Sequence, residues 1–319
     1  MDGPALDRAQ ILGPSAGRNT RAVTWSYSIS SLYSDLIGCE VRYHQTKKYR
    51  TRAIETGSGP VLILMHGGGG HAEAFARNMK RLGQHFRVMA IDFIWHGLSS
   101  APPFKLPRWA DQFTDQVIEL MDHLRLEKAH LEGESLGGRI CLDMAINHPG
   151  RVGKVILNTI SGAYLDPKVA PENQGDRQVM RQRSLAALDA PAADTIRKRL
   201  EWLMPRGGVT DDIVDARRQI WSRPETNQAL RDYYDHLFSP SHGTQTPHYH
   251  FDEKQIATIE VPTLVMWTDS NPVHNVAFGQ RLHSLIDGAE WHLMKNAGHW
   301  PQWEHPEEHD RVVTAFLTK

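Results

Sequence analysis

The feature that most constrains the fold is a serine between two glycines, placed where an apolar run gives way to a helical pattern. The stretch HLEGESLGGRI, residues 130–140, holds Ser135 with a glycine two positions away on each side. A strand that turns at once into a helix brings the two backbones almost into contact, and glycine removes the Cβ atoms that would collide. We therefore predict a strand, a strained turn that exposes the Ser135 hydroxyl, and a helix that begins beside it. The alternative is a tight turn without chemistry.

Strand-like and helix-like segments alternate on both sides of this turn. Strands are predicted at EVRYH, TRAIET, VLILM, FRVMAID, KAHLEG, GKVILNT, TLVMWT and EWHLMK. Helical spacing of apolar residues occurs over 111–126, 137–147 and 305–317. Such alternation predicts an α/β fold, a mostly parallel sheet with helices on both faces.

The character of the chain changes between residues 165 and 250. Apolar strands vanish, and segments such as DTIRKRLEWLM combine helical periodicity with many charges. We predict a helical cap over 165–250, inserted into a core made of 37–164 and 251–319. Residues 1–36 are punctuated by Gly, Pro and Ser, which is typical of a loosely ordered extension.

Composition excludes several classes of partner. A net charge of −1 gives no electrostatic reason to expect nucleic acid or a membrane surface. The longest apolar run, VLILM, is too short to cross a bilayer, and the N-terminus lacks the pattern of a signal peptide. Of the two cysteines, Cys141 falls on an apolar helix face, where we expect a buried free thiol. A cytoplasmic location fits.

A serine nucleophile needs a base and a site for negative charge. The run HGGGG, residues 66–70, follows a buried strand, so a backbone N–H there can face the same point as the N–H of Leu136. We predict an oxyanion hole made by Leu136 and Gly68, with Gly69 as the next candidate. His299, in a loop before the last helix, is predicted to be the base.

Two further features are the carboxylate partner of His299 and a possible metal site. The loop after TLVMWT offers one carboxylate, Asp269, and we favour it as the partner of His299. The stretch HGTQTPHYHFD, 242–252, holds three histidines and Asp252, but their irregular spacing argues against a metal site. We expect no metal and no other cofactor.

Taken together, residues 40–319 resemble the α/β-hydrolase superfamily, and most of all the meta-cleavage-product hydrolases, which split carbon–carbon bonds in ring-opened aromatic catabolites. The resemblance rests on HGGG, DFIWHGLS, GESLGG and GHWPQWEHPEE. It implies Ser135 as nucleophile, His299 as base and Trp300 packed on the substrate. In the cap, TDDIVDARRQIWSRP resembles the segment where that family places an arginine for the substrate carboxylate, and Arg217 is the matching position. The alternative for Arg217 is a solvated helix charge.

The resemblance also implies the surroundings of the substrate. Phe75, Trp221 and Trp300 are expected to shape a largely apolar pocket with Arg217 as its cation, and Gly69 is expected to face the substrate.

The chain departs from the family pattern at three places. The family's asparagine early in the helix after HGGG corresponds to Arg77 or to the neighbouring Asn78. The family's acid matches position 271, which is asparagine here, and an amide can either accept the histidine N–H or hold the wrong tautomer. The comparable Asp→Asn change in a serine protease costs about 10⁴ in turnover. The family's asparagine before the serine is Glu134 here, and a carboxylate there would repel acidic substrates unless it is protonated or turned away.

Three function classes follow. The leading one is a carbon–carbon hydrolase acting on a small molecule from aromatic degradation. The second is a carboxylesterase or lactonase with the same triad, and the third is a ligand-binding member without turnover. Dehalogenases and epoxide hydrolases of this fold use an aspartate nucleophile, which position 135 does not supply. A homodimer and a monomer both stay open.

Overall fold

The structure is a computed structural model that describes residues 31–169, 174–244 and 246–319. Most of the predicted extension 1–36 therefore lies outside the described residues. Residues 31–36 correct its boundary, because they form helix α1 (Leu32–Leu36), capped by the Ser31 hydroxyl, and belong to the folded body. Helix α1 packs against α2 (Ala76–Leu82), which explains its order.

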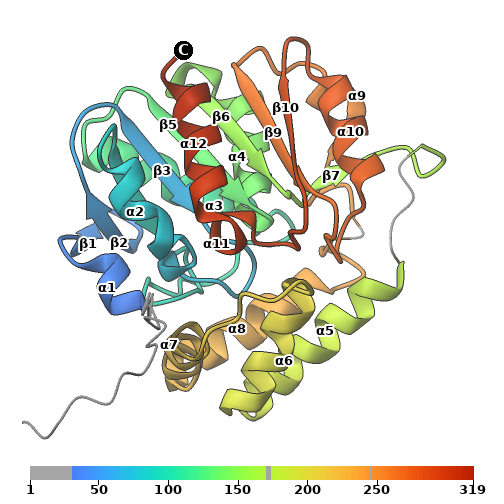
Figure 1. The fold of residues 1–319 in the computed structure, drawn as a ribbon. Helices are drawn as coiled ribbons and strands as arrows, with labels where there is room; N and C mark the ends of the chain where they lie inside the picture. The colour runs from blue at the N-terminus through green and yellow to red at the C-terminus, as the bar shows by residue number, and fades with distance from the viewer. Residues whose placement is uncertain (1–30, 170–173, 245) are drawn as a thin grey trace, which may run out of the picture. The chain divides into compact units, whose positions relative to one another are not determined.

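An eight-stranded sheet is the centre of the fold (Figure 1). Its strand order is β1-β2-β4-β3-β5-β6-β9-β10. Strands β1 and β2 form an antiparallel edge, and all pairs from β4 to β10 are parallel. The predicted α/β architecture is confirmed. The strands are β1 (Glu40–Gln45), β2 (Arg50–Thr56), β3 (Val61–Met65), β4 (Arg87–Ile91), β5 (Ala129–Glu134), β6 (Val152–Asn158), β9 (Thr263–Thr268) and β10 (Glu290–Met294).

Helices on both faces explain why the central strands are continuous apolar runs rather than alternating ones. Residues 62–65 of β3 and all of β9 are buried. The core helices and turns of helix are α3 (Asp111–His123), α4 (Leu136–Asn147), α9 (Glu253–Ile256), α10 (Val276–Leu285), α11 (Pro301–Glu304), α12 (Pro306–Leu317), η2 (Ala72–Phe75) and η3 (Pro149–Arg151). Helix α4 packs on β5 and β6, and α10 packs on β9.

Four helices occupy the segment predicted to be a cap, and they lie together below the sheet in Figure 1. They are α5 (Gln174–Asp189), α6 (Ala193–Leu203), α7 (Asp211–Trp221) and α8 (Pro224–Leu237). The short strands β7 (Ala163–Tyr164) and β8 (Phe251–Asp252) pair with each other on either side of this segment. The chain therefore leaves the core and returns to it at one place.

Two smaller expectations concern membranes and cysteines. None of the helices in the described ranges is long and apolar enough to span a bilayer. Cys39 and Cys141 are free thiols, and Cys141 is buried, as predicted.

Candidate active site

Ser135 lies in the strained turn that its sequence context predicts. Its φ is 52° and its ψ is −109°, so a residue with a side chain adopts the left-handed region between β5 and α4. A Cβ on Gly133 would lie 2.1 Å from the carbonyl carbon of Gly137, and a Cβ on Gly137 would lie 2.2 Å from the Met65 oxygen. The close approach of strand and helix therefore requires both glycines.

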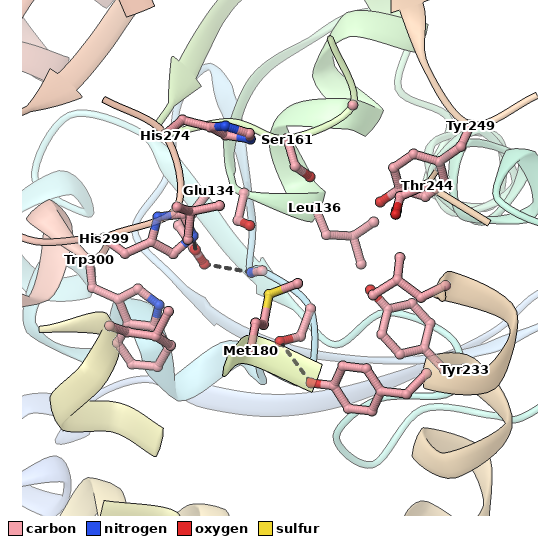
Figure 2. A pocket seen from close by; sticks show the side chains of 18 of the residues that line it. Glu134, Leu136, Ser161, Met180, Tyr233, Thr244, Tyr249, His274, His299 and Trp300 are labelled. Atoms are coloured by element: carbon pink, nitrogen blue, oxygen red, sulfur yellow. Dashed lines mark hydrogen bonds and ion pairs between the residues drawn. The ribbon is translucent and has the colours of Figure 1, made fainter. Parts of the chain in front are cut away.

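Ser135 lines a pocket between the sheet edge and the α5–α8 segment. Figure 2 shows this pocket from close by, with Glu134, Leu136 and His299 among its labelled residues. It encloses about 1030 Å³, including space open to solvent. Most of its wall is apolar or aromatic, with a few polar groups, as is usual for a small-molecule site. From the core, the wall includes Gly67, Gly68, Glu134, Leu136, Ser161, Val273, His274, His299 and Trp300, and from the inserted segment it includes Met180, Arg199, Trp202, Leu203, Tyr233, Tyr234 and Leu237.

His299 lines the same pocket, and Asn271 orients its ring. The Nδ1 atom of His299 lies 3.0 Å from the Asn271 Oδ1 atom, which also accepts the N–H of Val273 at 3.0 Å. Because a backbone N–H needs an acceptor, the amide oxygen rather than its NH₂ group faces the imidazole. The proton is then on Nδ1, and Nε2 has a free lone pair. Asn271 thus selects the tautomer that a general base requires.

Asp269 does not occupy the acid position, and our prediction for it is wrong. Its side chain is exposed and accepts hydrogen bonds from the Ser270 hydroxyl and from the backbone N–H groups of Asn296 and Ala297. The loop after β9 turns Asp269 toward solvent and buries Asn271, so the residue that reaches His299 is the amide.

Glu134 is buried between the glycine loop and the imidazole. Its Oε2 accepts the N–H of Gly67 at 2.6 Å, and its Oε1 lies 3.2 Å from the Nε2 atom of His299. Figure 2 shows the two side chains next to each other. Burial raises the pKa of Glu134 to about 8 and lowers the pKa of His299 to about 3. At neutral pH both groups are uncharged, so Glu134 does not repel an acidic substrate.

Ser135 and His299 line the same pocket, and no hydrogen bond joins them within the described chain. The Nε2 atom of His299 faces Glu134 instead. Catalytic hydrogen bonds of this kind are often formed only when substrate binds.

Both predicted oxyanion donors lie at the pocket. Leu136 is the first residue of α4, so its N–H has no acceptor within the helix. The N–H of Gly68 has no acceptor among the residues that the structure describes. A Cβ at position 68 would lie 2.7 Å from the Tyr233 hydroxyl, which explains the glycine. Two unused donors beside Ser135 can stabilise an oxyanion.

Of the residues expected around the substrate, Trp300 lines the pocket. Phe75 does not, because it ends η2 and is fully buried in the core. Trp221 also lies outside the pocket wall. Its indole covers the glycine loop, and its Nε1–H donates to the Gly69 carbonyl at 3.2 Å. Gly69 is therefore beneath Trp221 rather than open to a substrate.

Arg217 is buried behind these tryptophans. It is fully buried, so it is not a solvated helix charge. Its guanidinium lies over the Trp300 ring at 4.9 Å and over the Trp221 ring at 5.8 Å. None of its three guanidinium nitrogens has a hydrogen-bond partner within the described ranges, and burial lowers its pKa to about 9.

Arg199 is a pocket residue that the sequence analysis missed. Its Nη2 donates to the Gly68 carbonyl at 3.1 Å and to the Tyr234 hydroxyl at 3.0 Å, and its Nε donates to Ser184 at 3.0 Å. A signal was present, because Ile196, Leu200 and Leu203 define the buried face of α6 and position 199 falls on that face.

No group of three or more His, Cys, Asp and Glu side chains that could hold a metal ion occurs in the part of the chain that the structure describes. In the histidine-rich stretch, His242 contacts His236 at 2.8 Å, and His250 contacts the Thr244 carbonyl.

The fold and the elbow agree with the comparison to known families. The sequence model of the alpha/beta hydrolase fold matches residues 60–306. The chain belongs to the α/β-hydrolase family. A relative from Paraburkholderia xenovorans, named 2-hydroxy-6-oxononadienedioate/2-hydroxy-6-oxononatrienedioate hydrolase, is 26% identical over 264 residues, covering 80% of this chain and 86% of the relative. The resemblance stated from the motifs is confirmed.

Solved structures share the fold of this α/β hydrolase. A 2-hydroxy-6-oxo-6-phenylhexa-2,4-dienoate hydrolase from Rhodococcus aligns with a TM-score of 0.75 at 21% identity, covering 88% of this chain and 100% of that chain. A carboxylesterase from Bacillus subtilis aligns with a TM-score of 0.71 at 22% identity, covering 90% of this chain and 96% of that chain. The fold alone therefore does not separate the two reactions.

Proposed function

We propose that this protein is a serine hydrolase that cleaves a carbon–carbon bond next to a carbonyl in a ring-opened aromatic catabolite. The observation that carries the proposal is the pocket shared by Ser135 and His299, in which Asn271 holds the imidazole in the base-competent tautomer. The named relative supports the choice of substrate class. A small-molecule substrate and a cytoplasmic location are part of the proposal.

In the proposed mechanism, the Nε2 atom of His299 takes the proton of the Ser135 hydroxyl, and the resulting alkoxide attacks the substrate carbonyl. The N–H groups of Leu136 and Gly68 bind the oxyanion. The carbon–carbon bond then breaks, and the leaving carbon takes the proton that His299 holds. Water activated by the imidazole, now neutral again, hydrolyses the acyl-enzyme that remains and releases Ser135.

Carbon–carbon cleavage needs an earlier proton shift, in which a dienol loses its hydroxyl proton and gains one on carbon to become a ketone. Glu134 carries a proton at neutral pH and lies 3.2 Å from His299, so it is the available acid for this step. His299 accepts the hydroxyl proton, and Glu134 gives its own proton to the carbon. The protonated His299 then returns a proton to Glu134.

Ester or lactone hydrolysis is the second candidate. One observation favours it, because Asn271 supplies no negative charge to stabilise an imidazolium, and an activated ester demands less of the base than a carbon–carbon bond. The same nucleophile and oxyanion donors would serve both reactions.

The test is covalent labelling with a fluorophosphonate, read by intact mass, with the Ser135→Ala variant as control. We expect one adduct on the parent and none on the variant. An unlabelled parent would contradict both hydrolase proposals and favour a ligand-binding protein. If labelling succeeds, loss of the yellow colour of a dienoate, compared with hydrolysis of a nitrophenyl ester, decides between the two bonds.

A further inference from the structure

The glycine loop after β3 has no side chains of its own that could fix its shape. Residues 67–70 are all glycine, and Gly69 has a φ of 72°. Glycine samples more of φ/ψ space than any other residue, so hydrogen bonds from other parts of the chain have to hold such a loop. The origin of those hydrogen bonds therefore decides what keeps the Gly68 N–H, a proposed oxyanion donor, in place.

The core holds the first part of this loop. The N–H of Gly67 donates to Glu134 at 2.6 Å. The Gly67 carbonyl accepts the N–H of Gly70 at 2.9 Å and the Nδ1–H of His66 at 2.7 Å. The peptide bond between Gly67 and Gly68 is trans and planar, so this carbonyl and the Gly68 N–H point in opposite directions. Contacts within the core thus set the peptide plane on the N-terminal side of Gly68.

The inserted segment holds the second part of the loop. The Nη2 atom of Arg199 donates to the Gly68 carbonyl at 3.1 Å, and the Tyr234 hydroxyl donates to the same oxygen at 3.5 Å. The Nε1–H of Trp221 donates to the Gly69 carbonyl at 3.2 Å. These donors come from α6, α8 and α7 respectively, and within the described ranges no core residue hydrogen-bonds either carbonyl.

The donors on the inserted segment are themselves fixed. Arg199 is 3% exposed, and its guanidinium also donates to the Ser184 hydroxyl at 3.0 Å and to the Tyr234 hydroxyl at 3.0 Å. Trp221 and Tyr234 are buried, and a Cβ on Gly69 would lie 2.9 Å from the Trp221 ring. A loop without side chains is therefore packed between rigid groups, which is the preorganisation that an oxyanion hole needs.

We propose that Arg199, Trp221 and Tyr234 are positioning residues of the oxyanion hole, so that the inserted segment as well as the core fixes the Gly68 N–H. The inference rests on the proposed function, because it takes Gly68 as an oxyanion donor. Gly68 joins two peptide planes, one held by the core and one by the inserted segment, and both its φ and its ψ are thereby fixed. Loss of a donor from the inserted segment frees the second plane. The loss then falls on the covalent step rather than on binding.

The test measures the reaction of the full chain with a small, neutral fluorophosphonate, in which the Ser135 oxygen bonds to phosphorus and fluoride leaves. Intact mass at several reagent concentrations separates the maximal labelling rate from the concentration that gives half of it. Arg199→Met is expected to lower the maximal rate about 10- to 100-fold, and Tyr234→Phe about 3- to 10-fold. The half-saturating concentration should change by less than about threefold in both.

Tyr49→Phe is the matched control, because it also removes a hydroxyl from a buried tyrosine. That hydroxyl donates to Asp115 at 2.7 Å, and Tyr49 does not line the pocket. We expect its maximal rate to stay within about twofold of the parent. Arg199→Lys keeps a donor and is expected to recover part of the rate that Arg199→Met loses. Tyr234→Phe keeps the test decisive if Arg199→Met does not fold.

The ³¹P chemical shift of phosphonylated Ser135 is a second readout, because the phosphoryl oxygen of the adduct occupies the oxyanion hole and its hydrogen bonds move the resonance. We expect the shift to change in Arg199→Met and Tyr234→Phe and to stay at the parent value in Tyr49→Phe. Parental rates in both variants would overturn the inference. A lower rate with the parental shift, or an equal loss in Tyr49→Phe, would also overturn it, since general destabilisation then explains the loss. An unlabelled parent contradicts the proposed function itself, so the two failures are distinguishable.

Discussion

At the scale of single residues, position 271 decides how basic the imidazole of His299 is, and the proposed role of His299 as a base depends on that basicity. An aspartate would orient the ring and also stabilise the imidazolium with its charge. Asn271 orients the ring through its Oδ1 atom but adds no charge, and burial lowers the pKa of His299 to about 3. The imidazole of His299 is therefore oriented by Asn271 but is weakly basic.

The first prediction concerns the hydrogen bond between Asn271 and His299. Asn271→Ala is expected to slow fluorophosphonate labelling roughly 10- to 100-fold, because no other residue in the described ranges hydrogen-bonds the Nδ1 atom of His299. Asn271→Asp is expected to speed labelling, since a carboxylate stabilises the imidazolium. Asp269→Asn serves as the control and should change the rate by less than about twofold, because Asp269 is exposed. Slow labelling in Asp269→Asn with a normal rate in Asn271→Ala would refute the assignment.

The second prediction concerns pH. Below about pH 8 the carboxyl of Glu134, whose Oε1 atom lies 3.2 Å from the Nε2 atom of His299, is neutral, and above that pH it is charged and stabilises an imidazolium. This charge favours a basic His299 at high pH, so labelling of Ser135 should rise as pH passes through about 8. In Glu134→Gln, whose amide does not titrate, the rise should be absent; a rise that persists there would have another cause.

At the scale of elements, close backbone packing between β5, α4 and β3 fixes the turn that carries Ser135. Helix α4 starts directly after β5, and its second residue, Gly137, meets the end of β3. The turn is strained, so the packing around it has to supply stability.

Gly137→Ala tests this packing. The new Cβ would lie 2.2 Å from a backbone oxygen of Met65, which cannot move without shifting β3. We expect the free energy of unfolding to fall by about 2–4 kcal/mol, or the fold to be lost. Gly150→Ala is the matched control, because its Cβ would meet nothing within 4 Å, and it should change stability by about 0.5 kcal/mol or less. Equal denaturation midpoints for the two variants would contradict the steric argument.

At the scale of the whole molecule, a buried charge cluster connects the last helix to the centre of the sheet. His309 on α12 lies 2.6 Å from the Glu132 Oε1 atom on β5 and 2.9 Å from Asp310. Burial alone would lower the pKa of His309, but the two acids outweigh it and raise the pKa to about 10. Asn158 also donates to Glu132, at 3.0 Å, so the cluster is hydrogen-bonded on several sides.

The prediction at this scale is a stability that depends on His309 and on pH. His309→Gln is expected to lower the free energy of unfolding by about 3–5 kcal/mol, because it leaves Glu132 buried without its partner. The raised pKa means that the stabilisation is complete below about pH 6.5 and is lost as pH rises through about 10. Denaturant unfolding across this range measures it. His292→Gln, in a partly exposed pair with Glu308, is the control and should cost at most about 1 kcal/mol.

Short-range physics explains what the sequence alone determined. The run VLILM, the glycines beside Ser135 and the HGGGG loop report burial and close approach within a few residues, so the sheet, the elbow and the oxyanion candidates were predictable. His299 could be placed because the order of strands puts its loop at the same sheet edge.

Only the tertiary structure decided which side chains complete the site. Asp269 and Asn271 lie two positions apart in one loop. The turn of that loop exposes Asp269 to solvent and brings Asn271 to His299, and no local sequence pattern encodes this turn. Arg199 and Arg217 belong to an inserted segment whose contacts with the core are long-range. The packing of α6 and α7 over the glycine loop brings Arg199 to the pocket and buries Arg217 outside it, and neither helix by itself encodes that difference.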